Sequence, residues 1–361
     1  MEKITRNMTD EKPCVEIKED FLHAKHVKFF IRCLNVLPSS YSSLDTTRLT
    51  IAFFAISGLD ILNALDVIAD DKSNYIDWIY SLQILSGKGG NVNNCGFKGS
   101  STLHLKGYED FESPFDSGHI AMTYVALASL LILGDDLSRV DKKSVVESLK
   151  HLQLNDGSFC ATADGSENDM RFIFCACSIS YMLNDWSGVD ADGAVKYIQD
   201  SLAYEHGFAQ GPFLEAVGGS SYCALAALVL MGRLETAFSP DQLDKIKKWC
   251  IFRQKSGFHG RPNKPVDTCY SFWVGASLKL LGCYNFVNSK SNREFLMSTQ
   301  AQAVGGFSKW PDGHPDALHS YFGACGLALM DEPGLQAVYA PLNISQRAAN
   351  HLHRLHMTSL T

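Results

Sequence analysis

Two stretches of the chain, about fifty residues apart, carry side chains that could bind a metal ion. The first, GFHGRPNKPVDTCYSFWVG (257–275), places Asp267 and Cys269 two residues apart. The second, GGFSKWPDGHPDALHSYFG (305–323), has a similar layout and offers His319. A carboxylate, a thiolate and an imidazole suit zinc, and a three-ligand zinc site leaves a fourth position open. Because a single Cys or His on a helix more often belongs to the core, the hypothesis depends on the rest of the chain.

Both stretches are copies of a repeat that covers most of the chain. In each copy a Gln ends an amphipathic segment, a Phe follows within a short loop, and an apolar segment rich in small residues begins. Amphipathic segments are typical of outer helices, segments that are apolar all round are typical of buried ones, and no segment has the period of a strand. The sequence therefore predicts an all-α fold of repeated helical hairpins. The repeated residues are Gln83, Gln153, Gln199, Gln254 and Gln300, and Phe97, Phe159, Phe208, Phe258 and Phe307.

Such hairpins can build an open solenoid or a closed ring. The apolar segments carry almost no charge except near their starts. This pattern favours an α–α barrel (toroid) with inner and outer rings of helices. We expect residues 17–357 to form this single domain, after a disordered segment 1–16 and before a short tail 358–361.

Composition limits the classes of partner and the compartment. The 361 residues have a net charge of -7, which disfavours a nucleic-acid partner. The 11 cysteines are scattered through apolar segments without a CxxC pair, which indicates reduced thiols in the cytoplasm. The charged N-terminal residues do not form a secretory signal, and no apolar run is long enough to cross a membrane, so we expect no integral membrane protein.

In a barrel, all inner helices would start at one end, and polar residues would collect there. Taken singly, each is a helix cap or a surface charge, and for Asp316 the cap is the better interpretation. Taken together, they combine the metal ligands with basic residues beside helix N-termini, where phosphate binds readily. The residues are His119, Glu167, Arg171, Arg261, Lys264, Asp267, Cys269, Tyr270, Lys309, Asp316 and His319.

Aromatic residues on the inner segments would lie beneath this polar end. They are either ordinary core or the lining of a lipid pocket. A metal, a basic cluster and an apolar pocket indicate alkyl transfer from an isoprenoid diphosphate to a thiol. The metal would keep the thiol ionised, and the cations would stabilise the departing diphosphate. The aromatic residues are Phe54, Phe172, Phe174, Tyr222, Phe272, Trp273 and Phe322.

The sequence resembles the protein prenyltransferase β subunit family, and most closely the β subunit of protein geranylgeranyltransferase type I. The resemblance extends from about residue 20 to about residue 355 and is most specific around Asp267 and Cys269. It implies a heterodimer with a separate α subunit and transfer of a C20 isoprenoid from geranylgeranyl diphosphate. The acceptors would be proteins with a C-terminal CaaX sequence of the Leu type, such as small GTPases. The motifs are RLTIAFFAISGLDIL, DSGHIAMTY, HGRPNKPVDTCYSFWVGA, GGFSKWPD and HPDALHSYFG.

The resemblance also implies roles for individual residues. One zinc ion would be held by Asp267, Cys269 and His319, with the substrate cysteine as the fourth ligand. Lys309 stands where farnesyl-transferring relatives have a magnesium-linked Asp, so we expect no magnesium requirement. Thr50 stands where those relatives carry a Trp, which leaves room for a longer chain. The remaining roles are diphosphate binding by Arg261, Lys264, Tyr270 and Lys309, an isoprenoid pocket with Thr50, Phe54 and Phe322, and peptide binding by His119, Ala121, Glu167, Arg171, Phe172 and Leu318.

The chain departs from the family pattern at two places. Val217 replaces a His that binds diphosphate in the family, and the lost charge-assisted hydrogen bond would cost about 1.5–3 kcal/mol. The loop 98–114 does not follow the family either. Val217 leaves open a noncatalytic barrel that binds lipid or CaaX tails, and a farnesyl-transferring relative remains a further alternative. A terpene cyclase is disfavoured because no acidic proton-donor motif falls at the expected cavity.

Overall fold

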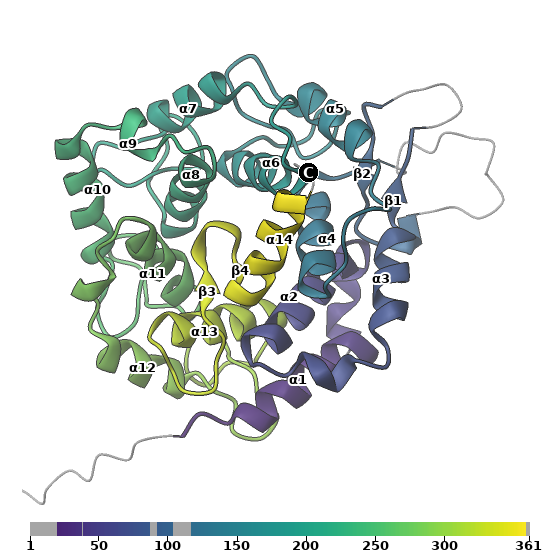
Figure 1. The fold of residues 1–361 in the computed structure, drawn as a ribbon. Coiled ribbons are helices and arrows are strands. Elements are labelled where there is room, and N and C mark those ends of the chain that lie inside the picture. Colours follow the sequence, from purple (N-terminus) through teal and green to yellow (C-terminus); the bar gives the residue numbers. More distant parts are fainter. Residues whose placement is uncertain (1–19, 38, 87–91, 104–116, 359–361) are drawn as a thin grey trace, which may run out of the picture.

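The fold was analysed in a computed structural model that describes residues 20–37, 39–86, 92–103 and 117–358. The segment 1–16, loop residues 104–114 and tail residues 359–361 lie outside the described residues, so those predictions stay untested. An inner ring of apolar helices surrounds the axis (Figure 1). Its members are α2 (Arg48–Ile61), α4 (Ile120–Ile132), α6 (Met170–Leu183), α8 (Gly218–Leu230), α11 (Tyr270–Leu280) and α13 (Ala317–Leu329).

The inner ring is closed. Each inner helix contacts the next inner helix in sequence order, and the last, α13, contacts the first, α2. Amphipathic helices form the outer ring around them (Figure 1). The structure therefore has the predicted α–α toroid rather than an open solenoid. The outer helices are α1 (His23–Asn35), α3 (Lys72–Tyr80), α5 (Lys142–Leu152), α7 (Ala191–Asp200), α10 (Pro240–Ile251) and α12 (Ser289–Ser298).

Burial separates the two rings as the sequence pattern predicts. In α4 every residue except Ala121 is buried, whereas α10 buries only Ile246, Trp249 and Cys250. Three inner helices are followed by a glycine with a left-handed backbone, at φ of 75°, 67° and 67°. A side chain is strained in this conformation, so glycine ends these helices at low cost. These glycines are Gly134, Gly232 and Gly282.

The repeated Gln joins neighbouring repeats. The side chain of Gln254 donates to the backbone carbonyl of Asn288 and accepts from its N–H, both at 2.9 Å. Gln153 makes the same pair of bonds to Asp190 at 2.9 and 2.7 Å. In the last repeat Gln300 accepts from the N–H of Leu22 at 2.9 Å, which links the end of the ring to its beginning. The repeated Phe side chains are fully buried beside these joints.

A recurrent aromatic residue on the outer helices packs against a glycine of the preceding turn. A Cβ atom on Gly207 would lie 2.3 Å from the ring of Trp249, and one on Gly257 would lie 2.2 Å from that of Phe295. No side chain fits at these distances. The aromatic residue before the Gln and the Gly before the Phe are therefore two halves of one contact between repeats.

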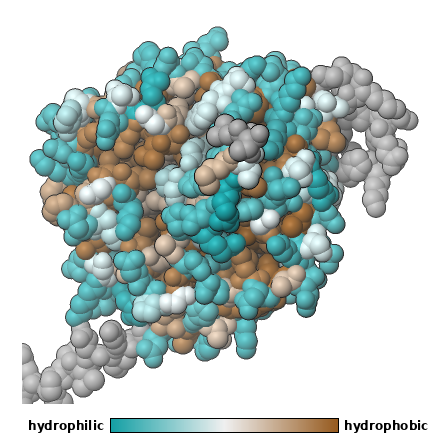
Figure 2. Space-filling model, viewed as in Figure 1, coloured by the Kyte–Doolittle hydropathy of each residue, from teal (hydrophilic) through white to brown (hydrophobic). Residues whose placement is uncertain are grey.

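The C-terminal segment closes one end of the barrel and occupies the centre of Figure 1. Hydroxyl groups of Tyr124, Tyr222 and Tyr321, from three inner helices, donate to backbone carbonyls of residues 340–343 at 2.7–2.9 Å. Arg347 donates to the carbonyl of Ile132 at the C-terminal end of α4. In this view hydrophilic side chains dominate the outer edge, and hydrophobic ones show between the centre and the surrounding helices (Figure 2). The segment comprises β3 (Val338–Tyr339), η5 (Ala340–Leu342), β4 (Ile344–Ser345) and α14 (Gln346–Thr358).

Short elements complete the described part of the chain. There, extended pairing is limited to isolated bridges and two antiparallel pairs of two-residue strands, with Gln83 opposite Phe97 and Val338 opposite Ser345. Strands this short leave no two-residue period in the sequence. The remaining elements are α9 (Leu234–Ala237), η1 (Ser39–Thr47), η2 (Leu65–Ile68), η3 (Ser101–Leu103), η4 (Tyr284–Phe286), β1 (Gln83–Ile84) and β2 (Gly96–Phe97).

Candidate functional site

The predicted metal ligands lie together at the end of the barrel where the inner helices begin. Asp267 and Cys269 directly precede α11, and His319 lies in the first turn of α13. One ligand atom from each residue lies within 4.8 Å of the other two. Asp267 and Cys269 are 7% and 8% exposed, and His319 is partly exposed. Adjacent repeats therefore contribute three different donors to one small volume, as the spacing predicts.

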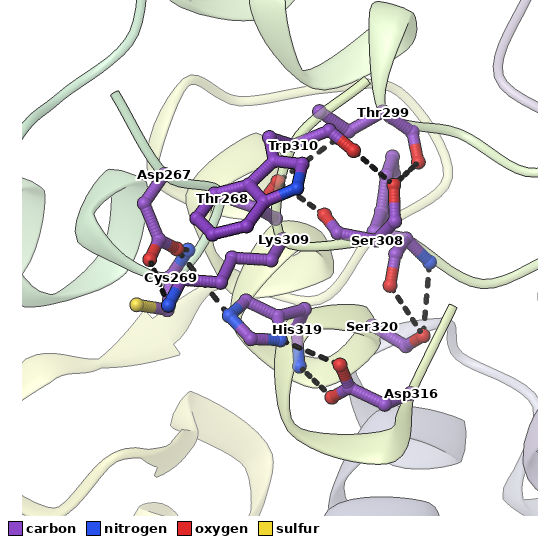
Figure 3. A network of polar contacts seen from close by, with 11 residues as sticks. Asp267, Thr268, Cys269, Thr299, Ser308, Lys309, Trp310, Asp316, His319 and Ser320 are labelled. Atoms are coloured by element: carbon purple, nitrogen blue, oxygen red, sulfur yellow. Dashed lines mark hydrogen bonds and ion pairs between the residues drawn. The ribbon is translucent and has the colours of Figure 1, made fainter. Parts of the chain in front are cut away.

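Asp316 orients the ring of His319 (Figure 3). One carboxylate oxygen accepts from the backbone N–H of His319 at 2.9 Å, and the other lies 2.7 Å from the ring Nδ1. The opposite nitrogen, Nε2, lies 3.3 Å from Asp267 Oδ1. This arrangement keeps a proton on Nδ1 and turns Nε2 toward the other two donors, so that loss of the Nε2 proton would leave a lone pair for a metal. Asp316 is the predicted helix cap, and it also makes this contact to the ring.

Burial and neighbouring charges shift the pKa values of all three donors. Burial alone would raise the pKa of Asp267, but hydrogen bonds with His319 and Cys269 bring that pKa below its usual range. Burial alone would lower the pKa of His319, and its contacts with Asp267 and Asp316 raise this pKa to about 9. Burial, followed by the charge of Asp267, raises the pKa of the Cys269 thiol. A bound cation would favour loss of the protons from the thiol and the imidazole.

Cationic side chains flank the three donors unevenly. Lys309 Nζ lies 3.8 Å from Asp267 Oδ2. Arg261 instead forms an ion pair with Glu215 at 2.7 Å, a partner that the sequence analysis did not assign. Lys264 is exposed in the same loop, and its backbone N–H donates to the Arg261 carbonyl. Of the predicted cations, Lys309 therefore lies beside a metal ligand, whereas Arg261 already has a carboxylate partner.

Tyr270 and Val217 lie at the starts of two neighbouring inner helices, α11 and α8. A Cβ atom on Gly260 would lie 2.1 Å from the Tyr270 ring, so the ring lies directly on the glycine backbone. Burial raises the pKa of Tyr270 to about 12, which keeps its hydroxyl protonated as a hydrogen-bond donor. Val217 begins α8 without a side-chain cap, and a Cβ on Gly219 would meet no atom within 4 Å. Open space therefore adjoins the uncapped helix start.

The predicted peptide-binding residues form a second group at the starts of α4 and α6. His119 Nδ1 accepts from the N–H of Ala121 at 3.1 Å, and the ring meets Phe172 edge-on at 6.0 Å. Burial lowers the pKa of His119, while the nearby charge of exposed Glu167 opposes this shift. Arg171 covers the Phe172 ring at 5.2 Å.

One residue outside the sequence prediction holds this second group. Asp169 caps α6 and binds the guanidinium of Arg171 through both carboxylate oxygens, at 2.6–3.1 Å. Its position one residue before the helix start is the sequence signal that could have identified it. Leu318 is 36% exposed and adjoins His319, so it lies with the metal ligands.

Aromatic rings from every inner helix form a closed circuit around the axis. Neighbouring ring centroids lie between 4.3 and 5.9 Å apart. Phe54 and Trp273 belong to this circuit but stay partly exposed. Thr50, one turn before Phe54 on α2, lies 3.4 Å from the sulfur of Met122. The circuit consists of Phe53, Tyr124, Phe174, Tyr222, Trp273, Phe322 and Phe54.

Residues 21–353 match the family described as the prenyltransferase alpha-alpha toroid domain. The chain is 40% identical over 337 residues to the geranylgeranyl transferase type-1 subunit beta of Dictyostelium discoideum, covering 90% of this chain and 95% of that protein. It is 39% identical to the subunit of the same name from Arabidopsis thaliana, covering 91% and 90%. The solved structure of Candida albicans protein geranylgeranyltransferase-I complexed with GGPP matches with a TM-score of 0.84 and 26% identity, covering 93% of this chain and 99% of that one.

A farnesyl-transferring relative also matches, at a lower level. The farnesyltransferase subunit beta of Schizosaccharomyces pombe is 30% identical over 333 residues, covering 86% of this chain and 78% of that protein. Among the described residues, no helix combines the length and the apolar character needed to cross a membrane.

Proposed function

The chain belongs to the prenyltransferase α–α toroid family and, within it, with the β subunits of geranylgeranyl transferase type 1; from this premise we propose that it transfers a C20 isoprenoid to a protein thiol. The donor would be geranylgeranyl diphosphate, and the acceptor a cysteine in a C-terminal CaaX sequence of the Leu type. The observation that carries the proposal is the convergence of Asp267, Cys269 and His319 from two repeats. Lys309 and the ion-paired Arg261 lie at the same end of the barrel.

The donor set fits zinc. One carboxylate oxygen, one sulfur and one imidazole nitrogen make a three-ligand set, and catalytic zinc sites with three protein ligands keep their fourth position for water or substrate. The Asp316 carboxylate accepts from Nδ1, as a carboxylate or carbonyl usually does beside a metal-binding histidine. When bound, zinc would supply a Lewis acid that keeps the substrate thiol ionised near neutral pH.

The chain's own residues would then align the two reactants. A bond forms between the cysteine sulfur and C1 of the isoprenoid, while the bond from C1 to the diphosphate oxygen breaks. The electron pair of that bond leaves with inorganic diphosphate, and the thiol proton passes to solvent. Lys309, Arg261 and Lys264 would stabilise the departing charge, and the Tyr270 hydroxyl would donate to it.

The remaining residues would select substrates. His119, Ala121, Glu167, Arg171, Phe172 and Leu318 would meet the peptide. Thr50, Phe54 and Phe322 would border the isoprenoid, and the small side chain of Thr50 supports a C20 chain over a C15 chain. A separate α subunit would complete the enzyme, which we propose acts in the cytoplasm. The fixed cation of Lys309 would replace magnesium.

Transfer of labelled isoprenoid tests this proposal. The β chain would be produced with a prenyltransferase α subunit and given zinc, a C20 donor and a peptide ending in Cys-a-a-Leu. We expect stoichiometric transfer to the peptide cysteine, faster than with a C15 donor or a peptide ending in Ser. No turnover with either donor would refute the proposal.

A noncatalytic tail-binding barrel is the second candidate, because Val217 leaves α8 uncapped at the proposed diphosphate end. Tight peptide binding without turnover, unchanged by Val217→His, would favour it. Turnover that Val217→His accelerates would instead identify a catalytic site with a weakened contact to the donor.

A further inference from the structure

The two loops that carry the metal ligands are held together by a buried hydroxyl network (Figure 3). Thr268, between Asp267 and Cys269, is fully buried. Its hydroxyl donates to the carbonyl of Ser308 at 2.7 Å and lies 3.0 Å from the hydroxyl of Thr299. Thr268 has a single hydroxyl proton, and the shorter contact places it on the Ser308 carbonyl, while the Thr299 hydroxyl donates to the carbonyl of Leu296 at 2.9 Å.

The same network continues to the third ligand. The N–H of Phe307, one residue before Ser308, donates to the hydroxyl of Ser320 at 2.9 Å. Ser320 directly follows His319. The segment 307–309 therefore binds Thr268 on one side and Ser320 on the other. Its hydrogen bonds therefore connect the segment that carries Asp267 and Cys269 to the helix turn that carries His319.

One backbone hydrogen bond recurs between neighbouring repeats and therefore belongs to the fold rather than to the metal site. In each of five repeats, a residue at the start of an inner helix donates its backbone N–H to the carbonyl two residues after the next buried Phe, at 2.9–3.0 Å. This backbone bond is the common structural joint. The donor and acceptor pairs are Leu49 with Gly99, Ile120 with Ala161, Met170 with Gln210, Gly218 with Gly260, and Thr268 with Lys309.

Thr268 is the exception among these donors. Leu, Ile, Met and Gly have no side-chain hydrogen-bonding group apart from the weak thioether acceptor of Met, so the joint forms without a hydroxyl. The added hydroxyl bond occurs in the repeat that carries the Asp–x–Cys pair, where the relative position of two adjacent loops decides whether three donors can meet. If the fold itself required this hydroxyl bond, the residues at the other four joints would be expected to carry a hydroxyl as well.

We propose that Thr268 is a positioning residue for the zinc site, and that its hydroxyl bond to Ser308 sets the distance between the ligands of the two repeats. This inference rests on the proposed function only in requiring that the three donors bind zinc. The Thr268 hydroxyl bonds to Ser308 and Thr299 rather than to the three donors.

The test uses the αβ enzyme with two changes at one position. Thr268→Val removes the hydroxyl at nearly constant volume, and Thr268→Ser keeps it. Zinc affinity is measured by competition with a chromophoric chelator, and cobalt substituted for zinc reports thiolate coordination by its charge-transfer absorption. We expect Thr268→Val to weaken zinc binding by about tenfold or more and to alter the cobalt spectrum, as partners of metal ligands do. Thr268→Ser should stay close to the wild type.

Thr123→Val supplies the matched control. Thr123 is a buried residue of another inner helix, and its hydroxyl accepts from the N–H of Phe97 at 2.9 Å. Its loss should lower stability without changing zinc affinity. Wild-type zinc affinity in Thr268→Val, or equal loss in the Val and Ser variants, would overturn the positioning role while leaving the transferase proposal standing. Absence of zinc binding in the wild type would overturn both.

Discussion

The contact between Asp316 and His319 leads to a prediction that separates metal binding from folding. The carboxylate does two things: it caps α13 by accepting from the His319 N–H, and it accepts the ring proton on Nδ1. Asn is about as good a cap as Asp, so Asp316→Asn can keep the first contact. The second changes in kind, because an amide oriented as a cap presents its NH2 group to Nδ1.

Replacing the acceptor beside Nδ1 with a donor favours the His319 tautomer that carries its proton on Nε2. With a donor facing it, Nδ1 keeps its lone pair and the proton moves to Nε2, the nitrogen 3.3 Å from Asp267. A protonated Nε2 cannot bind metal. Partners of metal-binding histidines typically contribute about 10–100-fold in affinity, which corresponds to roughly 1.4–2.7 kcal/mol. If the amide flips to avoid this, the cap is lost instead, at a cost of about 1 kcal/mol of stability.

The assay measures zinc affinity by chelator competition and stability by thermal unfolding. Asp316→Asn should bind zinc about 10–100-fold more weakly than the wild type. Asp190→Asn is the matched control, since Asp190 caps the outer helix α7 through the N–H groups of Asp192 and Gly193. It should leave zinc affinity unchanged. Wild-type affinity in Asp316→Asn, with its stability also intact, would refute the reasoning about the tautomer.

Three further predictions concern stability and selectivity. His26 is buried, donates from Nε2 to Gln300 and accepts at Nδ1 from Gly306, and burial lowers its pKa to about 4. Between pH 6.5 and 4 the His26 side chain is therefore protonated in the unfolded chain but not in the folded one. The free energy of unfolding, measured with urea, should fall by about 3 kcal/mol as the pH drops through this range. A free energy of unfolding that does not change with pH in this range would contradict the prediction. Thr50→Trp should shift donor preference from C20 toward C15 in competition assays, and an unchanged ratio would argue against a steric role. Lys309→Asp should make turnover depend on magnesium, whereas turnover of both forms without response to magnesium would show that the lysine replaces no ion.

The sequence predicted the fold because its signals are periodic and local. Five copies of the Gln and Phe pattern recur along the chain, and the inner segments are apolar all round, as the closed ring requires. The Asp267, Cys269 and His319 constellation was predictable because both loops belong to copies of that repeat. Equivalent positions in adjacent repeats lie side by side in a toroid.

What the sequence did not predict depends on contacts between residues far apart in the chain. The ion pair of Arg261 with Glu215 joins residues 46 positions apart, and the hydroxyl bond of Thr268 to Ser308 joins residues 40 positions apart, without a repeated pattern. Asp169 and Asp316 look alike as helix caps, and only their side-chain partners, Arg171 and His319, distinguish them. Closure of one end by residues 338–358 also depends on long-range bonds from inner-helix tyrosines.

Metal content of the purified αβ enzyme tests the central claim most directly. Dialysed protein would be analysed for zinc by atomic emission, as wild type and as Cys269→Ala and His319→Ala, with thermal unfolding to confirm that each is folded. We predict one zinc per β chain in the wild type and its loss in both variants. Substoichiometric zinc in the wild type that neither substitution changes would contradict the account.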